Sequence, residues 1–445
     1  MNFKLRSVCL AVGLASASSA VHADDLLQIY QQALAKDPIL LQARANRDAA
    51  YEAIGESRAS LLPQINATLG YSNTFYNREV SDREDDGFNA GLRLDQTIYN
   101  HANYVNLDLT KQAASQAELA YSLQIQSLIV RVSQAYFDVL SAQDNLDFVQ
   151  ANKRAIERQL EQTKQRFAVG LTAITDVHEA QAQFDLAVAN EIQAQNNLEN
   201  SYEALREITG LAHDDLNVLD TARFSPSAPT PTSHEQWQTI AEDSSLQLLI
   251  DRLGVEIAKQ QISLAKTGHL PSVGFVASYN ENAEFSNTPD NGEGSLGVEV
   301  KVPIFSGFAV SSQVKQANYN YVGAQQSLEE THRNVVRNLR ASLNNVNASI
   351  SSIRAFEQSV VSAESALKAT EAGFEVGTRT IVDVLNSTQQ LYSAKQQLSD
   401  ARYGYIIAVL ALKQAAGTLS EEDVAMINQG LRQATAADSD GDQKQ

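Results

Sequence analysis

The chain contains one motif twice, first as Gln165-Arg-Phe-Ala-Val-Gly170-Leu-Thr-Ala-Ile-Thr-Asp-Val177 and then as Gly373-Phe-Glu-Val-Gly377-Thr-Arg-Thr-Ile-Val-Asp-Val384. The spacing between the two occurrences also separates Leu205 from Leu412 and Gly210 from Gly417, without a gap. Repetition at a fixed spacing is the signature of an architecture in which each copy folds alike. We therefore expect two tandem structural repeats.

The similarity extends upstream of this motif. Leu62-Pro63 matches Leu270-Pro271, Ile98-Tyr99 matches Ile304-Phe305, and a proline-rich stretch at 225–231 separates the copies. These features divide the chain into four parts after its N-terminal segment. They are repeat one at 24–224, a linker at 225–238, repeat two at 239–418 and a polar C-terminal tail at 419–445.

The N-terminal segment, residues 1–23, has the pattern of a secretory signal peptide. Lys4 and Arg6 precede a short apolar core, and the segment ends at the small residue Ala23. The apolar core is too short to act as a membrane anchor, and no run of about 20 apolar residues follows it. Cys9, the only cysteine, lies inside this segment, so the mature chain has neither disulfides nor thiol chemistry. We expect an exported protein.

Each repeat contains two runs in which apolar and polar residues alternate. This period of two is typical of strands whose faces meet different surroundings, and the run lengths suit a transmembrane β-barrel. In repeat one the apolar members are Ile65, Ala67, Leu69, Tyr71, Phe88, Ala90, Leu92 and Leu94. In repeat two they are Val273, Phe275, Ala277, Tyr279, Leu296, Val298, Val300 and Val302.

The longest segments have a helical period instead. Apolar residues recur at steps of three and four in both repeats, which is the heptad pattern of a coiled coil. The positions are Ile125, Leu128, Val132, Ala135, Val139, Ala142, Leu146 and Val149, and then Val336, Leu339, Leu343, Val346, Ile350 and Ile353. Residues 102–168 contain neither proline nor glycine. At 1.5 Å per residue this segment would be about 100 Å long, which suits a tube rather than a globular domain.

Four strands cannot close a barrel, and an open sheet edge in lipid leaves backbone groups without hydrogen bonds at several kcal/mol each. Closure therefore requires several chains. Two chains would give a barrel filled by its own side chains, whereas three would leave a passage. The physical argument requires an oligomer and does not choose between these two.

Composition and motifs argue against several other functions. The formal net charge of −19 disfavours binding to nucleic acid and to anionic lipid headgroups. The G-x-G-x-x-G pattern at 292–297 precedes an expected strand, whereas a dinucleotide site needs a helix after it. The aspartate-rich run at 438–442 lacks the distal glutamate of a calcium loop and lies in the polar tail. The sequence therefore predicts no catalytic residue, metal site or cofactor.

The duplicated order, the segment Ala135-Tyr-Phe-Asp-Val-Leu140 and the two motifs quoted above resemble the TolC family of outer-membrane factors. The likeness extends to about Gly417. It implies a mixed fold: a homotrimer with four strands per chain, a twelve-stranded transmembrane β-barrel, and a long α-helical coiled-coil barrel in the periplasm. It also implies a passive exit duct for drug-efflux pumps and type I secretion, located in the outer membrane. The implied partners are outer-membrane lipid, a periplasmic adaptor protein and an inner-membrane RND or ABC transporter.

The resemblance also assigns roles at the periplasmic tip. The two turns between long helices would form the adaptor-docking end, comprising Val169, Gly170 and Leu171 in one and Val376, Gly377 and Thr378 in the other. Glycine suits such turns because it adopts left-handed backbone angles. Asp383 would line the gate constriction, where three carboxylates would repel one another and attract cations. The alternative is that Asp383 is an ordinary acid at a helix N-terminus.

Polar links that close the tip in the family fall here on Thr175, Asp176, Phe374 and Arg379. Two residues depart from the family pattern. Phe374 stands where a tyrosine is expected, so it cannot donate a hydroxyl hydrogen bond to Asp176, and Asn386 stands where a second acidic ring is expected. We therefore predict a looser closure and a constriction with three carboxylates rather than six.

Two other classes of function remain open from the residues alone. One is a surface-exposed trimeric coiled-coil protein with a structural or adhesive role, which would share the heptads but would not conduct ions. The other is a soluble periplasmic enzyme, which would require the strands to close into a soluble core. Ion conductance in a planar bilayer distinguishes the first class from a channel, and fractionation after cell lysis distinguishes the second.

Overall fold

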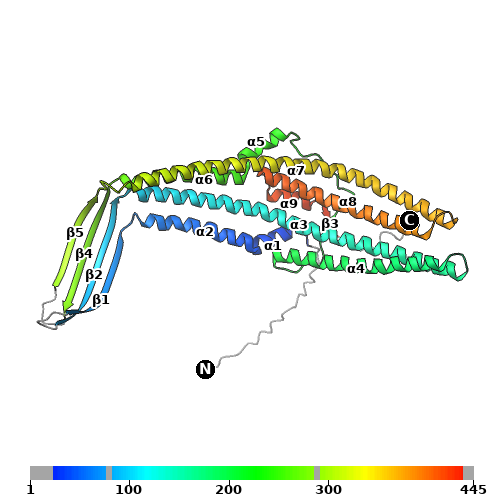
Figure 1. The fold of residues 1–445 in the computed structure, drawn as a ribbon, viewed down its shortest axis with the longest axis horizontal. Coiled ribbons are helices and arrows are strands. Elements are labelled where there is room, and N and C mark those ends of the chain that lie inside the picture. Colours follow the sequence, from blue (N-terminus) through cyan, green and yellow to red (C-terminus); the bar gives the residue numbers. More distant parts are fainter. Residues whose placement is uncertain (1–23, 77–82, 285–290, 434–445) are drawn as a thin grey trace, which may run out of the picture.

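The computed structural model describes residues 24–76, 83–284 and 291–433. The molecule is long and narrow, with a β-sheet at one end and helices running away from it to two turns at the other end (Figure 1). The expected signal peptide at 1–23 and the aspartate-rich run at 438–442 lie outside the described residues. Among the described residues, no helix combines the length and the apolar character needed to cross a membrane.

The two repeats have the same order of elements, which confirms the duplication. In each, two helices precede the strand pair. Repeat one contains α1 (Leu26–Lys36), α2 (Pro38–Ala59), β1 (Gln64–Tyr76), β2 (Arg83–Tyr99), α3 (His101–Ala168) and α4 (Ile174–Thr209). Repeat two contains α5 (His234–Ser244), α6 (Leu246–Lys266), the 3-10 turn η1 (Thr267–His269), β4 (Ser272–Glu284), β5 (Asn291–Lys301), α7 (Ala309–Glu375) and α8 (Ile381–Ala416).

The four long strands form one antiparallel sheet in the order β1-β2-β4-β5. Residues directly opposite each other share a face, and Tyr71 opposes Phe88 while Ala277 opposes Leu296. One face is therefore apolar and exposed, with Leu296 80% exposed. The other face is polar, and on it the Ser278 and Ser295 hydroxyls lie 2.8 Å apart. Within the described chain, β1 and β5 each have one edge without a strand partner.

The helices form the rest of the molecule. α3 has 68 residues and α7 has 67, so each is about 100 Å long, as expected from the sequence. α2, α3, α6 and α7 pack side by side next to the sheet, whereas α4, α3, α8 and α7 pack side by side toward the far end (Figure 1). The heptad positions form the packed seams; Leu128 and Val139 are buried in α3, and Leu339 and Val346 are buried in α7.

Short elements surround the middle of the helical part. α1, the strand pair β3 (Val218–Leu219) and β6 (Leu431–Arg432), and α9 (Glu421–Asn428) pack there. The sequence places the start of a polar tail at 419, whereas the structure continues the packed core to Arg432. Leu419 and Val424 are buried, and Ser420 and Asp423 form a capping box that starts α9. The tail boundary therefore lies after these elements.

The boundary of the linker also differs from the one expected. α5 begins at His234, inside the stretch 225–238 assigned to the linker, because Ser233 caps the helix by accepting a hydrogen bond from the Glu235 backbone N–H at 3.2 Å. Trp237 is buried against α7 and α8, and its ring N–H donates to the Pro231 carbonyl at 2.5 Å. Only the segment before α5 connects the repeats.

Candidate functional site: the helical tip

Two glycine turns form the end of the molecule farthest from the sheet (Figure 1). Gly170 joins α3 to α4 with φ 79°, and Gly377 joins α7 to α8 with φ 78°. Backbone hydrogen bonds close both turns: Leu171 donates to the Arg166 carbonyl and Thr378 to the Gly373 carbonyl, each at 2.8 Å. The space around each glycine is open, so the left-handed backbone angle is what favours glycine there.

Apolar side chains project from both turns. Val169 and Leu171 are each 70% exposed, and Val376 is 75% exposed. Single exposed apolar residues are common, but here all three lie in the two turns at the end of the molecule. The residues predicted to form the docking end therefore lie in these two turns, with Val169, Leu171 and Val376 accessible in the single chain.

Asp383 occupies the first turn of α8. Its carboxylate accepts hydrogen bonds from the Thr380 backbone N–H and the Thr380 hydroxyl, both at 2.9 Å, while the Asp383 N–H donates to the Thr380 hydroxyl at 3.3 Å. This is a capping box. The backbone hydrogen bond, the hydroxyl hydrogen bond and nearby Arg379 all lower the pKa of Asp383, which keeps it charged in the single chain.

Asp176 holds the corresponding position in α4 but has a different partner. Ala173 at the N-cap supplies no side-chain hydrogen bond. The Thr172 hydroxyl, one residue earlier, donates to the Asp176 carboxylate instead. Thr175 is exposed beside it. Both acids of the repeated motif therefore bind a threonine of their own turn.

Phe374 lies near the end of α7 and packs against an apolar cluster from α3, α4 and α8 that includes Leu160, Ala180 and Ile381. The central guanidinium carbon of Arg166, from α3, lies 4.6 Å from the centre of the Phe374 ring. This contact joins the two helical hairpins of one chain. Cation–π pairs at exposed sites contribute about 0.5–1 kcal/mol.

The other predicted tip residues are exposed. Arg379 lies in the α7–α8 turn, and Asn386 lies on α8 one turn after Asp383. Within the described part of this chain, no hydrogen bond or ion pair joins Arg379 to Thr175 or Asp176. The structure thus brings Phe374 and the α3–α4 hairpin together, whereas the polar links expected from the sequence do not form within one chain.

Three further residues make contacts at this tip, although the sequence predicted no role for them: Arg166, Thr172 and Thr380. The spacing of Thr380 and Asp383 fits a capping box and was available as a signal. Arg166 had no comparable signal, because its partner is distant in the chain. Across the described ranges, no group of three or more histidine, cysteine, aspartate or glutamate side chains is arranged to hold a metal ion.

The chain is similar to proteins of known family. The family model described as "Outer membrane efflux protein" matches residues 29–211 and 238–418, one segment in each repeat. The sequence is 50% identical to outer membrane protein TolC of Vibrio cholerae over 97% of this chain and 99% of that protein. It is 31% identical to the alkaline protease secretion protein AprF of Pseudomonas aeruginosa over 90% of this chain and 86% of that protein.

A solved structure supports the fold. The outer membrane channel CmeC of Campylobacter jejuni superposes with a TM-score of 0.75, covering 97% of both chains at 16% sequence identity.

Proposed function

This chain belongs to the outer membrane efflux protein family, and on that premise we propose that three copies assemble into one gated channel. The protein is an outer-membrane exit duct for efflux and secretion, with its helical part extending into the periplasm. Its family is one of transport conduits. We propose that the chain catalyses no reaction and that an inner-membrane partner supplies the energy for export.

The observation that carries the trimer proposal is the four-stranded sheet with two unpaired edges and one apolar face. The strands alternate in direction, so β5 of one copy and β1 of the next would meet antiparallel, as a continuous barrel requires. Three sheets would give twelve strands, enough to surround a passage, with the apolar face toward lipid. Closure would satisfy every edge hydrogen bond.

The proposed partners follow from the tip. A periplasmic adaptor would dock on Val169, Gly170 and Leu171 and on Val376, Gly377 and Thr378, six turns in all for three copies. The adaptor would connect the duct to an RND or ABC transporter of the inner membrane. The exposed apolar side chains of these turns support this role, because burying them against a partner would be favourable.

The proposed gate is a ring of three Asp383 carboxylates, with Asn386 one turn further along α8. The polar links between hairpins would involve Thr175, Asp176 and Arg379 of neighbouring copies, and Phe374 would contribute its ring without a hydroxyl. Mutual repulsion in the ring would raise the pKa of each Asp383, opposing the lowering by Thr380. We propose that such a ring attracts cations and that the closure is loose.

Single-channel recording in a planar bilayer tests the channel and the gate. The wild-type trimer is expected to conduct and to be blocked by multivalent cations from the side of the tip. The Asp383→Ala variant is expected to conduct more and to lose the block. Asp176→Ala is the matched control for the block alone: it removes a closing link, so its conductance should also rise, but it leaves the Asp383 ring intact and should keep the block. A trimer without conductance would favour a structural or adhesive protein. Unchanged block in Asp383→Ala would refute the gate assignment.

Cross-linking tests the docking surface. The only native cysteine is Cys9, in the expected signal peptide, so an introduced cysteine can be labelled specifically. Val169→Cys and Val376→Cys, each carrying a photo-cross-linker, are expected to capture an adaptor in intact cells. Ser365→Cys, exposed on α7 away from the tip, is the control. Equal capture at all three positions would contradict docking at the turns.

A further inference from the structure

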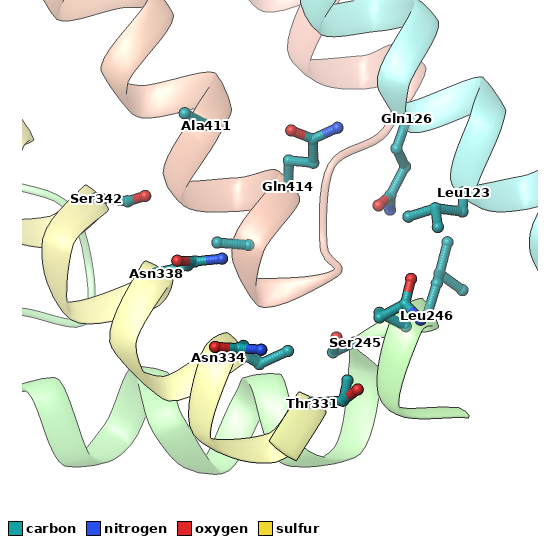
Figure 2. Close-up of a pocket in the computed structure, with 13 residues that line it drawn as sticks. Leu123, Gln126, Ser245, Leu246, Thr331, Asn334, Asn338, Ser342, Ala411 and Gln414 are labelled. Carbon is teal, nitrogen blue, oxygen red and sulfur yellow. The ribbon is translucent and has the colours of Figure 1, made fainter. Parts of the chain in front are cut away.

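A cavity of about 500 Å³ lies in the middle of the helical part, where α3, α6, α7 and α8 meet (Figure 2). Figure 2 shows Gln126 and Leu123 reaching into it from α3 and Asn334 and Asn338 from α7, with Gln414 on α8. Ser245 and Leu246 close it at the start of α6. The lining side chains are amides, hydroxyls and aliphatic groups, with no charged side chain among them.

The duplication supplies a reference for this place in the fold, because Asp37 of repeat one corresponds to Ser245. Each residue ends one helix and starts the next, with φ −60° and ψ 119° at Asp37 and φ −63° and ψ 114° at Ser245. Their N–H groups donate to Ala33 and Ala241 at 2.8 and 2.9 Å. The two backbones therefore have the same local conformation.

Repeat one places a carboxylate at this junction. The Asp37 carboxylate accepts from the Leu40 N–H at 2.8 Å, which caps α2. Arg131 of α3 donates to both carboxylate oxygens, at 3.1 and 2.7 Å. The carboxylate thus interacts both with the N-terminus of α2 and with the guanidinium of Arg131, which binds it in a bidentate way. It is almost completely buried.

Repeat two has the same junction without a carboxylate. Ser245 is buried, and its side chain caps no N–H of α6. Asn338, which lines the cavity, stands at the position that corresponds to Arg131. The start of this 21-residue helix therefore faces a space lined by amide donors, where repeat one has the carboxylate of its own chain.

Gln126 gives a second and independent sign of a missing partner. It is only 7% exposed, and its amide nitrogen donates to the carbonyls of Gly417 at 3.2 Å and Leu419 at 3.0 Å. These two acceptors fix the orientation of the amide, because a carbonyl oxygen cannot face another carbonyl. Its oxygen is buried without a hydrogen-bond partner, and the Gln126 side chain lines the cavity. An unpaired buried acceptor destabilises the folded state, and a bound donor would remove that cost.

We infer that this cavity binds a small carboxylate-bearing molecule whose N–H or O–H lies next to the carboxylate. The carboxylate takes the place that the Asp37 side chain has in repeat one, at the N-terminus of α6, with Asn338 and Ser245 as donors. The N–H or O–H donates to the free oxygen of Gln126. Leu123 and Leu246 contact the apolar part of the ligand. Because no cationic side chain lines the site, we expect weak binding.

Saturation-transfer NMR on the purified full-length trimer tests this site, with N-acetylglycine as the probe. Its carboxylate and neighbouring amide N–H match the two features of the cavity. N-acetylglycinamide, which has the same shape without the charge, is expected to bind about fivefold more weakly, since it gains less from the helix N-terminus.

Ser245→Asp installs the carboxylate of repeat one and is expected to abolish saturation transfer to N-acetylglycine. Ser233→Asp is the matched control, because it makes the same change at the half-buried N-cap of α5, outside the cavity, and should leave binding intact. Asn338→Leu removes a donor without adding charge and should weaken binding. It is the alternative test if the Ser245→Asp variant does not assemble into trimers. The inference is overturned if the wild-type trimer shows no transfer, if the neutral probe binds equally, or if Ser245→Asp or Asn338→Leu binds like the wild type.

Discussion

Arg166 at the end of α3 lies over the ring of Phe374 near the end of α7, with 4.6 Å between the central guanidinium carbon and the ring centre. Arg166 and Phe374 each lie about one helical turn before the glycine of their own hairpin, Gly170 and Gly377. Their contact therefore links the α3–α4 and α7–α8 hairpins of one chain close to the proposed gate. It uses the face of the ring and needs no hydroxyl. Contact between the two hairpins within a chain therefore includes a cation–π contact and packing against the cluster around Leu160.

Phe374→Tyr is expected to tighten the closed tip. The ring keeps its contact with Arg166, and the new hydroxyl can donate to a carboxylate such as Asp176. A hydrogen bond to a charged group contributes about 1.5–3 kcal/mol. In single-channel records the fraction of time that the channel spends open should therefore fall about tenfold. Phe167→Tyr makes the same change in repeat one and should leave the record unchanged; an equal effect from both variants would contradict the assignment.

Thr380→Val is expected to shift the pH dependence of cation block. The Thr380 hydroxyl lowers the pKa of Asp383, second to the backbone hydrogen bond, so its removal should raise that pKa. Cation block requires the charged Asp383 carboxylate, so it is lost as pH falls through the pKa of Asp383. In Thr380→Val the loss should begin at a higher pH than in the wild type. Thr172→Val, which removes the donor to Asp176, should not move the block curve.

The sequence predicted the elements of this fold far better than their contacts. A period of two or of three to four residues reflects which side of a strand or helix faces a different environment. Leu296 and Val346 therefore predict a strand and a helix even when the elements that pack against them are unknown. Arg166 and Phe374 meet only because two hairpins from different repeats pack together, and no local pattern records this. Leu419 and Val424 failed as signals for a related reason, because two apolar residues in a polar stretch gain their burial from α1 and α3.

The joint between α1 and α2 provides a test of stability. Asp37→Ser leaves Arg131 without its carboxylate in a partly buried place, and removing one member of such a pair costs about 3 kcal/mol. The heat-unfolding transition of the trimer, followed by circular dichroism, should move to lower temperature. Asp37→Ser with Arg131→Asn copies the arrangement of repeat two and should recover most of the loss. Asp48→Ser, at an exposed ion pair, is the control and should change little.

The contact between α3 and α8 at Asp144 should make the stability of the protein depend on pH. Its carboxylate accepts hydrogen bonds from the Ser399 hydroxyl and, at 2.8 Å, from the Tyr403 hydroxyl of α8. Burial raises the pKa of Asp144, and these hydrogen bonds only partly oppose the rise. The folded state therefore binds a proton more tightly than the unfolded chain does. This contribution to stability is complete below the unfolded pKa and is lost as pH rises through the raised pKa.

Asp144→Asn stays neutral at every pH and keeps an oxygen that can accept from Tyr403. Relative to the wild type, the variant should gain thermal stability as pH rises from about 4 toward neutrality, with a plateau once wild-type Asp144 is ionised. Asp383→Asn should show the opposite trend, at lower pH: the Thr380 hydrogen bonds lower the pKa of Asp383 in the single chain, so the variant should lose stability relative to the wild type as pH rises toward the unfolded pKa of about 4 and should stay level above it. Heat unfolding measured on both sides of about pH 4 for both variants tests the two signs. If the unfolding temperatures of wild type and Asp144→Asn changed in parallel with pH, burial would not control the charge of Asp144.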